Sequence, residues 1–299
     1  MKRILLLGRN GQVAWELRRT LAPLGEVITL DRQSDPSVDL AKADTLLQAV
    51  RSSKPDIIVN AAAYTAVDRA EEEADLAGKI NAIAPGILAE EAKKIGATLI
   101  HYSTDYVFPG DGNAPYREED PTGPQSVYGS TKLAGEQAIV SSGASYLIFR
   151  TAWVYGARGH NFLLTMLRLM REREQLGVVD DQIGSPTWSR LIAETTAQIL
   201  ARQLNGEQQK GIYHLTCSGQ TSWFGFASKI REMGIQLGLL EEDTALVNPI
   251  GSEAYPTPAK RPGYSVLDNH QLKEAFGLQL PDWHEALALC MESLSNGRC

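Results

Sequence analysis

The first half of the chain alternates short apolar runs with longer stretches in which apolar residues recur at helical spacing. The apolar runs are rich in β-branched and aliphatic residues and cover 3–7, 26–30, 56–60, 97–103 and 146–150. Runs of this length are typical of strands that are buried on both faces. The stretches between them have helix-forming composition and cover 11–24, 43–53, 77–96 and 130–143. This alternation predicts an α/β fold with right-handed crossovers and a doubly wound parallel sheet of the Rossmann type.

The pattern loosens after about residue 155. A loop rich in Gly, Asp and Pro covers 178–190, and a Pro-rich connection without a regular period covers 248–265. Connections of that length in compact domains are usually functional or disordered. We expect residues 1–155 to form a dinucleotide-binding domain, joined by part of 178–215. We expect 156–299 to form mainly a smaller, irregular C-terminal domain that binds the substrate at the carboxyl ends of the strands.

The composition is that of an ordinary globular protein, with 43% hydrophobic and 22% charged residues among 299. A net charge of −7 and a pI of about 5.4 exclude the broad basic surface of a nucleic-acid-binding protein. The first apolar run ends at Leu7, too short for a signal peptide, and no run is long enough to span a membrane. We therefore expect a cytoplasmic protein with no membrane or nucleic-acid partner.

Neither cysteines nor histidines are arranged as metal ligands. Cys217, Cys290 and Cys299 are too few and too scattered for a disulfide framework or a CxxC site, which predicts free thiols in a reducing compartment. The five histidines lack any close ligand spacing such as HExxH. No dedicated metal site is expected from these residues.

A glycine turn directly follows the first apolar run and opens the first expected helix. It consists of Gly8, Arg9, Asn10, Gly11, Gln12, Val13 and Ala14. Glycines in this context let the backbone turn tightly and approach a pyrophosphate, whose charge is stabilised at the helix N-terminus. The alternative is a simple strand-to-helix turn.

An acidic residue after the second apolar run favours the dinucleotide interpretation. Asp31 lies about 20 residues beyond Gly11, where a carboxylate can bind the adenosine ribose of NADH. Arg32 follows at once, and its guanidinium could bind the 2′-phosphate of NADPH. The sequence leaves the choice between NADH and NADPH open.

Tyr128 and Lys132 form a Tyr-x-x-x-Lys element. Four residues are about one helical turn, so a helix through 127–140 would place both side chains on one face. An ammonium close to a phenol favours the phenolate and lowers the phenol pKa from its usual value near 10. The pair is therefore a candidate acid/base device. The alternative is a half-buried ring beside a solvated amine.

Several segments together resemble a known family. The glycine turn, "NAAAYT" at 60–65, "STD" at 103–105 and the Tyr-x-x-x-Lys element resemble the extended short-chain dehydrogenase/reductases. Within them, "GQVAWEL", "PDIIVNAAAYTAVDRAE", "IHYSTDYVFPG", "FRTAWVYG", "DDQIGSPT" and "YPTPAKRP" are similar to the dTDP-4-dehydrorhamnose reductases almost phrase by phrase. One departure is Ala14, which stands in place of the last glycine of the turn.

The resemblance implies NADPH- or NADH-dependent reduction of dTDP-4-dehydro-β-L-rhamnose to dTDP-β-L-rhamnose. This is the last step of dTDP-rhamnose synthesis, which supplies surface polysaccharides such as the lipopolysaccharide O-antigen. By resemblance, Tyr128 donates the proton to the ketone oxygen. Lys132 lowers the pKa of Tyr128 and binds the nicotinamide ribose, and Thr104 holds the carbonyl oxygen.

The resemblance also implies two sets of binding residues. The cofactor would contact Gly8, Asn10, Gly11, Gln12, Val13, Asp31, Arg32, Asp39, Leu40, Ala63, Tyr64, Thr65, Tyr128 and Lys132. The dTDP-sugar would contact Thr104, Asp105, Trp153, Asn161 and Arg261. From the residues alone, Tyr64 could equally pack in a loop, Trp153 in the core, and Arg261 could be a solvated charge.

Other functions share this motif set. A sugar-nucleotide epimerase or dehydratase has the same fold and Tyr/Lys pair, and a reductase-like regulatory subunit could bind dinucleotide without turnover. The sequence leaves the oligomeric state open, and a homodimer is one arrangement it allows. Mg²⁺ at a subunit contact also stays open: Glu16 and other surface carboxylates could bind it, although solvated surface charge is the default.

Overall fold

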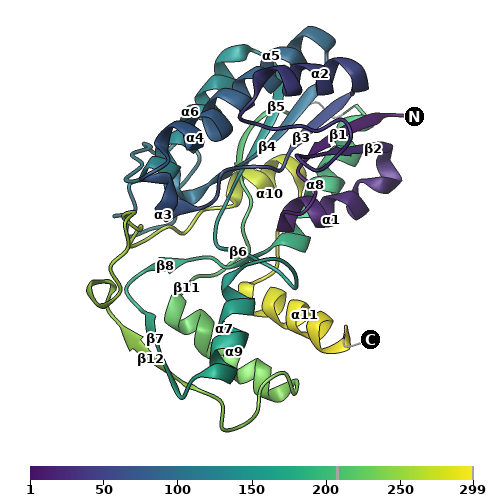
Figure 1. The fold of residues 1–299 in the computed structure, drawn as a ribbon. Coiled ribbons are helices and arrows are strands. Elements are labelled where there is room, and N and C mark those ends of the chain that lie inside the picture. Colours follow the sequence, from purple (N-terminus) through teal and green to yellow (C-terminus); the bar gives the residue numbers. More distant parts are fainter. Residues whose placement is uncertain (207–208, 298–299) are drawn as a thin grey trace.

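A parallel sheet organises the first part of the protein. The computed structural model describes residues 1–206 and 209–297, and in these the sheet has six strands in the order β10-β5-β4-β3-β1-β2 (Figure 1). The strands are β1 (Arg3–Leu7), β2 (Glu26–Leu30), β3 (Ile57–Asn60), β4 (Thr98–Thr104), β5 (Ser145–Thr151) and β10 (Gly211–His214). All five neighbouring pairs are parallel. The predicted doubly wound α/β fold is confirmed.

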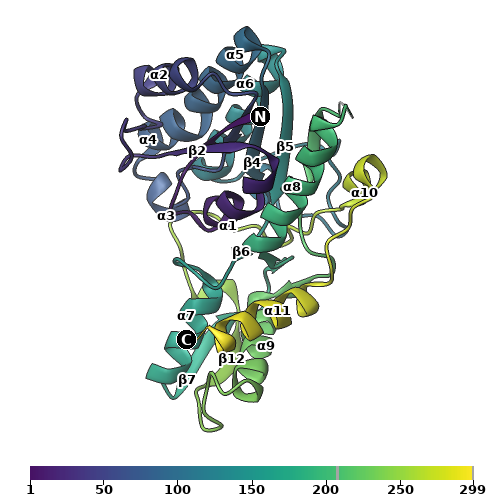
Figure 2. The same cartoon turned by 90° about the vertical axis from the view of Figure 1, so that its right-hand side faces the viewer.

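Helices cover both faces of this sheet (Figure 2). One face carries α1 (Gln12–Thr20) and α8 (Ser189–Leu204); the other carries α2 (Ala43–Ser53), α5 (Ala84–Ile95) and α6 (Val127–Ser142). Successive side chains of a strand point to opposite faces. On β1, Ile4 and Leu6 therefore belong to the apolar cluster under α1 and α8, while Leu5 and Leu7 belong to the cluster under α2, α5 and α6. Burial on both faces explains why these strands are continuous apolar runs.

The expected helix at 77–96 is interrupted. Its first residues belong to α4 (Ala74–Gly78), a π-helical turn covers Lys79–Ile83, and α5 continues from Ala84. A short helix, α3 (Val67–Ala70), precedes α4. Pro85 at the start of α5 lacks an amide hydrogen, so the regular α-helical bonding cannot run unbroken through this stretch.

A second group of elements lies below the carboxyl ends of the strands in Figure 1. Its helices are α7 (Phe162–Glu172), α9 (Trp223–Gln236) and α11 (Trp283–Asn296), and α10 (His270–Phe276) lies beside the sheet. Its strand pairs are β7 (Gln175–Val179) with β12 (Leu246–Ile250), β8 (Ile183–Gly184) with β11 (Thr221–Ser222), and β6 (Val154–Tyr155) with β9 (Thr187–Trp188). The start of the Pro-rich connection is thus a strand, because 248–250 lie in β12.

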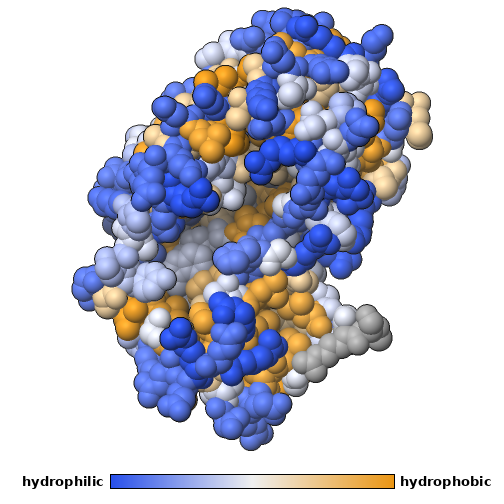
Figure 3. Space-filling model, viewed as in Figure 1, coloured by the Kyte–Doolittle hydropathy of each residue, from blue (hydrophilic) through white to orange (hydrophobic). Residues whose placement is uncertain are grey.

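The two groups share one apolar core. A single cluster runs from Ile4 on β1 through Tyr155 on β6 to Phe226 on α9 and Cys290 on α11. On the surface, a recess separates the sheet-bearing part from the second group, and apolar side chains are visible inside it (Figure 3). The two groups are therefore joined through a common core, and the carboxyl ends of the sheet strands face the recess between them.

Two sequence expectations concern the chain as a whole. In residues 1–206 and 209–297, no helix is long and apolar enough to cross a membrane. Cys217 and Cys290 are buried free thiols. Cys299 lies outside the described residues.

Candidate active site

The strand ends bring the predicted site residues to one edge of the sheet. Parallel strands end at the same edge, and β1, β3, β4 and β5 end at Leu7, Asn60, Thr104 and Thr151. In doubly wound sheets, ligands bind in the crevice outside these carboxyl ends. The glycine turn, the loop after β3 and the residues after β4 therefore line one region.

The glycine turn is built for close approach. Gly8 has φ +99° and a Cβ on it would lie 3.3 Å from the carbonyl oxygen of Ala61, so a larger residue would be strained and crowded there. Gly11 precedes α1, and no side chain of the residues that the structure describes caps the first N–H groups of this helix. An uncapped helix N-terminus beside an open glycine offers the amides and the dipole that bind a pyrophosphate. Ala14 is fully buried beneath the helix, where its methyl group fits.

The acidic residue after β2 is held in a turn through one of its carboxylate oxygens. Asp31 Oδ1 accepts a hydrogen bond from the amide of Gln33 at 2.8 Å, which fixes the side chain in a turn. Arg32 is exposed. Asp39 is held in the same manner by the amide of Ala41 at 3.0 Å, and Leu40 packs partly buried against the core.

The loop after β3 is fixed by a buried asparagine. Asn81, in the π-helical turn, accepts a hydrogen bond from the Tyr64 amide at 2.9 Å and donates one to the Tyr64 carbonyl at 3.1 Å. The Tyr64 phenol donates to Glu73 at 2.5 Å, so its side chain is engaged within the loop region. Ala63 and Thr65 on either side are exposed. This arrangement leaves the loop surface beside the glycine turn open to a ligand.

Thr104 and Asp105 form a buried polar pair at the end of β4. The Thr104 hydroxyl donates to Asp105 Oδ1 at 3.0 Å and accepts from the amide of Tyr106 at 3.2 Å. Asp105 is 2% exposed, and its Oδ2 has no hydrogen-bond partner in the described part of the chain. Burial raises the pKa of the Asp105 carboxyl to about 6. A buried acceptor without a partner is suited to a ligand hydroxyl.

Helix α6 carries Tyr128 to this pair. Ser126 caps the helix by accepting from the amide of Gly129 at 3.2 Å. A Cβ on Gly129 would overlap the Tyr106 carbonyl oxygen, so only glycine lets the first turn of α6 sit this close to the end of β4. The Tyr128 ring consequently meets the Tyr106 ring edge to face, with centroids 5.5 Å apart.

The phenol of Tyr128 differs in one respect from the sequence expectation. Burial raises the pKa of Tyr128 above its usual value, hydrogen bonding by Thr104 opposes the shift, and Lys132 makes no contribution. The expected lowering of this pKa by Lys132 is therefore not seen, because the ammonium is bound elsewhere. A raised pKa keeps the phenol protonated at neutral pH, as a proton donor requires.

Lys132 lies inside the fold, with 1% of its surface exposed. Its Nζ donates to the Tyr102 carbonyl at 2.5 Å and lies 3.1 Å from Nε2 of His101. Desolvation lowers the pKa of Lys132 to about 8. One turn further on, Glu136 forms a buried ion pair with Arg150 at 2.7 Å. The predicted helical pair exists, and the lysine is held from β4.

Trp153 is held in a strained conformation by a second tryptophan. Its backbone has φ +47°, which is rare for a bulky residue and frequent at ligand sites. Its indole stacks on Trp223 with centroids 3.5 Å apart and an interplanar angle of 4°. Trp153 is partly exposed, so the core alternative does not describe it fully. Trp223, at the start of α9, is a residue that the sequence did not single out.

The remaining two predicted substrate residues have other partners. Asn161 is 7% exposed; it caps α7 through the amide of Leu164 at 3.1 Å and donates to Gln12 Oε1 at 2.9 Å. It thereby ties the second group of elements to the glycine turn. Arg261 is paired with Asp68 at 2.6 Å and donates to the Tyr106 hydroxyl at 3.0 Å, so it is not a solvated charge. Their contact with a diphosphate stays a prediction.

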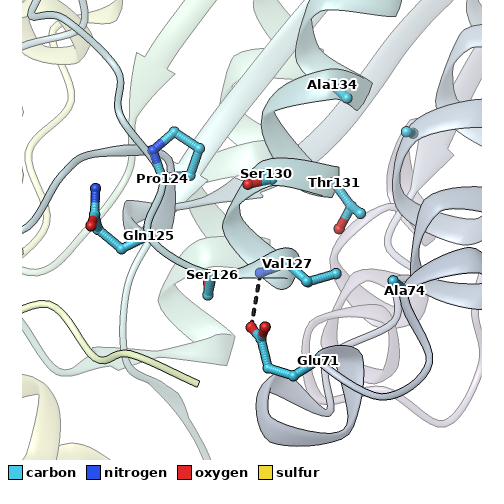
Figure 4. Close-up of a pocket in the computed structure, with 10 residues that line it drawn as sticks. Glu71, Ala74, Pro124, Gln125, Ser126, Val127, Ser130, Thr131 and Ala134 are labelled. Carbon is cyan, nitrogen blue, oxygen red and sulfur yellow. Dashed lines mark hydrogen bonds between the residues drawn. The ribbon is translucent and has the colours of Figure 1, made fainter. Parts of the chain in front are cut away.

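An open pocket of about 580 Å³ lies on a different face of α6 (Figure 4). Val127, Ser130, Thr131 and Ala134 line it from the helix, at the 3- and 4-residue spacing of one helix face. Figure 4 shows Glu71 accepting from the Val127 amide at the mouth, at 2.9 Å. Tyr128, Thr104 and Asp105 do not line this pocket, so it is separate from the strand-end site.

No metal site emerges from the described side chains. Within 1–206 and 209–297, no three or more His, Cys, Asp or Glu residues are grouped so that they could hold an ion. Glu16 faces Arg19 instead, at 3.8 Å. Mg²⁺ at a contact between subunits stays a hypothesis.

His101 is a residue of the site that the sequence analysis did not predict, although the periodicity of its strand indicates it. His101 and Ser103 alternate with Tyr102 along β4, so both point to the face that α6 covers. Polar side chains on a buried strand face indicate a functional or paired position. Asp68, Tyr106 and Trp223 carried no such signal, because their partners lie far away in the sequence.

The chain is similar to proteins of one described activity. The profile of the RmlD substrate binding domain matches residues 1–296. A dTDP-4-dehydrorhamnose reductase of Burkholderia thailandensis is 49% identical over 297 residues, which are 98% of this chain and 99% of that protein.

Solved structures agree with this similarity. A dTDP-4-dehydrorhamnose reductase of Clostridium acetobutylicum has a TM-score of 0.88 and 39% identity, and the match covers 98% of this chain and 99% of that one. The reductase of Bacillus anthracis, determined in complex with NADP, has a TM-score of 0.87 and 36% identity, with the same coverage of 98% and 99%.

Proposed function

The chain belongs to the RmlD substrate binding domain family, and on that premise we propose that it reduces dTDP-4-dehydro-β-L-rhamnose to dTDP-β-L-rhamnose. It is an NAD(P)H-dependent oxidoreductase of dTDP-rhamnose synthesis. The observation that carries the proposal is the meeting of Tyr128 with Thr104 and Asp105 beside the glycine turn. The Tyr128 phenol can donate a proton to a ketone oxygen, the Thr104 hydroxyl can hold that oxygen, and Asp105 Oδ2 can accept a sugar hydroxyl.

The residues around the strand ends fit a dinucleotide. The uncapped start of α1 and the glycines at 8 and 11 suit the pyrophosphate, which Asn10, Gln12 and Val13 would also contact. Asp31 and Arg32 would bind the adenosine ribose or its 2′-phosphate, and Asp39 with Leu40 would flank the adenine. Ala63, Tyr64 and Thr65 would run along the cofactor.

Bound NAD(P)H supplies the hydride that reduces the ketone carbon. The protein must hold the ketone oxygen and deliver a proton to it. The Thr104 hydroxyl donates its one proton to Asp105 in the unliganded protein, and it would turn that proton to the ketone oxygen beside Tyr128 when the substrate binds. Tyr128 would donate its phenolic proton as negative charge develops on the oxygen, and Lys132 would bind the nicotinamide ribose.

The sugar nucleotide would lie in the recess between the sheet and the second group of elements. Asp105 Oδ2 would accept a sugar hydroxyl, and Trp153 would contact the sugar nucleotide from the opposite side. Arg261 has its cationic guanidinium near Tyr106 and is the better placed of the two diphosphate candidates, since Asn161 is engaged in capping α7. In this arrangement residues 1–155 and part of 178–215 would hold the cofactor, and 156–299 would mainly hold the substrate.

The test is consumption of reduced nicotinamide. Purified protein is mixed with dTDP-4-dehydro-L-rhamnose and either NADPH or NADH, and absorbance of the reduced cofactor is followed while the product sugar is identified. We expect stoichiometric oxidation and dTDP-L-rhamnose as product. Folded protein that binds NADPH but consumes none with this ketosugar would refute the proposal. The ratio of kcat/KM for the two cofactors then measures their preference.

The same assay separates the rival functions. An epimerase returns its hydride to the sugar, so it needs no added reductant. A dehydratase is expected to have further acidic residues beside its catalytic hydroxyl, whereas Asp105 alone adjoins Thr104 in "STDYVF". A regulatory subunit would bind NADPH without consuming it. Among the described side chains of the site, no contact favours any of these three functions over ketone reduction.

A further inference from the structure

A buried polar chain extends from Lys132 into the sheet. Nζ of Lys132 lies 3.1 Å from Nε2 of His101, and Nδ1 of His101 lies 3.1 Å from the side-chain amide nitrogen of Asn60. All three side chains are 1% exposed. They come from three elements, because Asn60 ends β3, His101 lies in β4 and Lys132 in α6. Groups this deeply buried are expected to be fully hydrogen-bonded.

The lysine has no carboxylate within hydrogen-bonding distance in the described part of the chain. Its contacts are the Tyr102 carbonyl and the His101 ring. Glu136 favours the ammonium from one turn away, but its own charge is paired with Arg150. On the other side stand Tyr128, which is protonated at neutral pH, and the buried Asp105. The imidazole is therefore the nearest neutral group that can respond to the lysine proton.

The protonation state of Lys132 and the tautomer of His101 depend on each other. A neutral imidazole carries one proton for two ring nitrogens. If Lys132 is an ammonium, it donates to Nε2, and the ring proton is on Nδ1, where the oxygen of the Asn60 amide accepts it. If Lys132 is a neutral amine, its lone pair needs a donor, which Nε2–H supplies, and the amide nitrogen of Asn60 then donates to Nδ1. The observed amide orientation is that of the second state, in which the Asn60 oxygen also accepts from the Ala62 amide at 3.4 Å. The first state needs the amide to turn, which gives up this long hydrogen bond for the one to Nδ1–H.

The ring itself stays neutral through this exchange. Burial and the nearby lysine hold the pKa of His101 well below its usual value, so the imidazole does not become a second cation. A protonated ring would also leave Nε2–H facing the ammonium without an acceptor. The observed geometry thus requires a neutral histidine in both states.

We propose that His101 is a positioning residue for Lys132: its Nε2 holds the lysine Nζ toward the catalytic centre, and the imidazole changes its tautomer when the lysine gains or loses a proton. The hydrogen bonds to His101 and the Tyr102 carbonyl occupy two N–H groups of the ammonium. The third N–H is left for the nicotinamide ribose. The kinetic consequence rests on the proposed reductase function, whereas the tautomer change does not.

The direct test is the ring-nitrogen NMR of His101 in the cofactor-free protein. Histidine-labelled wild type is compared with Lys132→Met from pH 6 to 10, and His101→Asn identifies the signals. We expect the protonated nitrogen to change from Nδ1 to Nε2 with a midpoint near the Lys132 pKa of about 8. Lys132→Met should show one tautomer throughout. A wild-type ring that keeps one tautomer over this range, or the same transition in Lys132→Met, would overturn the proposal.

Two substitutions of His101 test the consequence for turnover. The amide of Gln reaches the position of Nε2 and can still accept from Lys132, whereas the shorter Asn reaches only the position of Nδ1. We expect kcat to fall at alkaline pH as Lys132 loses its proton. In His101→Asn this fall should occur about one pH unit lower, because the ammonium loses an acceptor that favours it. In His101→Gln, kcat should fall at the same pH as in the wild type.

NADPH affinity and the melting temperature of both variants serve as controls for folding. If His101→Asn and His101→Gln are folded and kcat of both falls at the same pH as in the wild type, the positioning role is refuted. Because the NMR measurement needs no substrate, a tautomer change in a protein without ketosugar reductase activity would contradict only the proposed function.

Discussion

Thr104 is fixed before any substrate arrives. It accepts the Tyr106 amide and donates its one proton to Asp105, which fixes the hydroxyl oxygen beside the phenol of Tyr128. Only the proton would turn, from Asp105 to the ketone oxygen, where it stabilises the charge that develops during the reaction. Thr104 is also 4% exposed, which keeps water from competing with it.

This fixation predicts a clear effect of replacing Thr104. Thr104→Val keeps the shape and removes the hydroxyl, and we expect kcat to fall about 10²-fold with NADPH affinity unchanged. Thr104→Ser keeps the hydroxyl and should retain most of the activity. Steady-state kinetics with fluorescence titration of NADPH measures both. Equal activity of the Val and Ser variants would remove Thr104 from the reaction.

The protonation of His214 makes the free energy of unfolding depend on pH. It is fully buried on β10; burial and the nearby Arg150 hold its pKa at about 3, against about 6.5 in an unfolded chain. The unfolded state therefore binds a proton below pH 6.5 that the folded state refuses. The stabilising contribution is present above pH 6.5 and is lost as the pH falls toward 3.

The pH dependence can be measured against a matched variant. His214→Asn keeps a donor near the Nδ1 position, which contacts the Asp268 carbonyl at 3.0 Å, and removes the titration. Between pH 6 and 5, the wild type should lose about 1.2 kcal/mol more unfolding free energy than the variant. Urea unfolding at the two pH values tests this. The same loss in both proteins would show that His214 does not titrate on unfolding.

At the scale of elements, the contact between the β5–β6 link and α9 holds the substrate side of the site. Trp153 leaves the sheet with a left-handed backbone, and Trp223 is fixed at the start of α9 by the cap that Ser222 forms on the amide of Gly225 at 2.9 Å. Stacked aromatic pairs contribute about 0.5–1.5 kcal/mol beyond burial. The stack therefore defines where the Trp153 indole stands.

Loss of the stack should weaken binding of the sugar nucleotide and leave the cofactor site intact. We expect Trp223→Leu to raise the KM for the ketosugar about tenfold, with the NADPH affinity of the wild type, whereas Trp223→Phe keeps an aromatic face and should change KM less. Initial-rate kinetics with each substrate varied in turn distinguishes the two effects. A Trp223→Leu protein with normal KM would show that Trp153 does not need its partner.

The bounds of the strands in the first half could be predicted well from the sequence. The five strands expected in the first half begin and end within one residue of the observed ones, because burial on both faces leaves continuous apolar runs. The interruption at Lys79–Ile83 was not predictable from periodicity, since helical spacing continues through it. Strand β12 was hidden in a Pro-rich segment because its pairing with β7 is distant in the sequence.

At the scale of the whole molecule, the site is made by contacts between distant segments. Gln12 meets Asn161, Asp68 meets Arg261, and Trp153 meets Trp223. Local patterns contain no record of such partners. The sequence could therefore place Tyr128, Lys132 and Thr104 at one sheet edge, but not the ring of His101 beside Lys132 or the raised pKa of the Tyr128 phenol.

The central claim is that Tyr128 delivers the proton that completes ketone reduction. The measurement is the rate of NADPH oxidation with dTDP-4-dehydro-L-rhamnose by wild type and Tyr128→Phe, each saturated with NADPH as determined by titration. General acid catalysis typically contributes 10²–10⁴-fold, so we predict a loss of turnover of roughly that size in Tyr128→Phe, with cofactor affinity barely changed. Turnover near that of the wild type at equal cofactor occupancy would contradict the role of Tyr128.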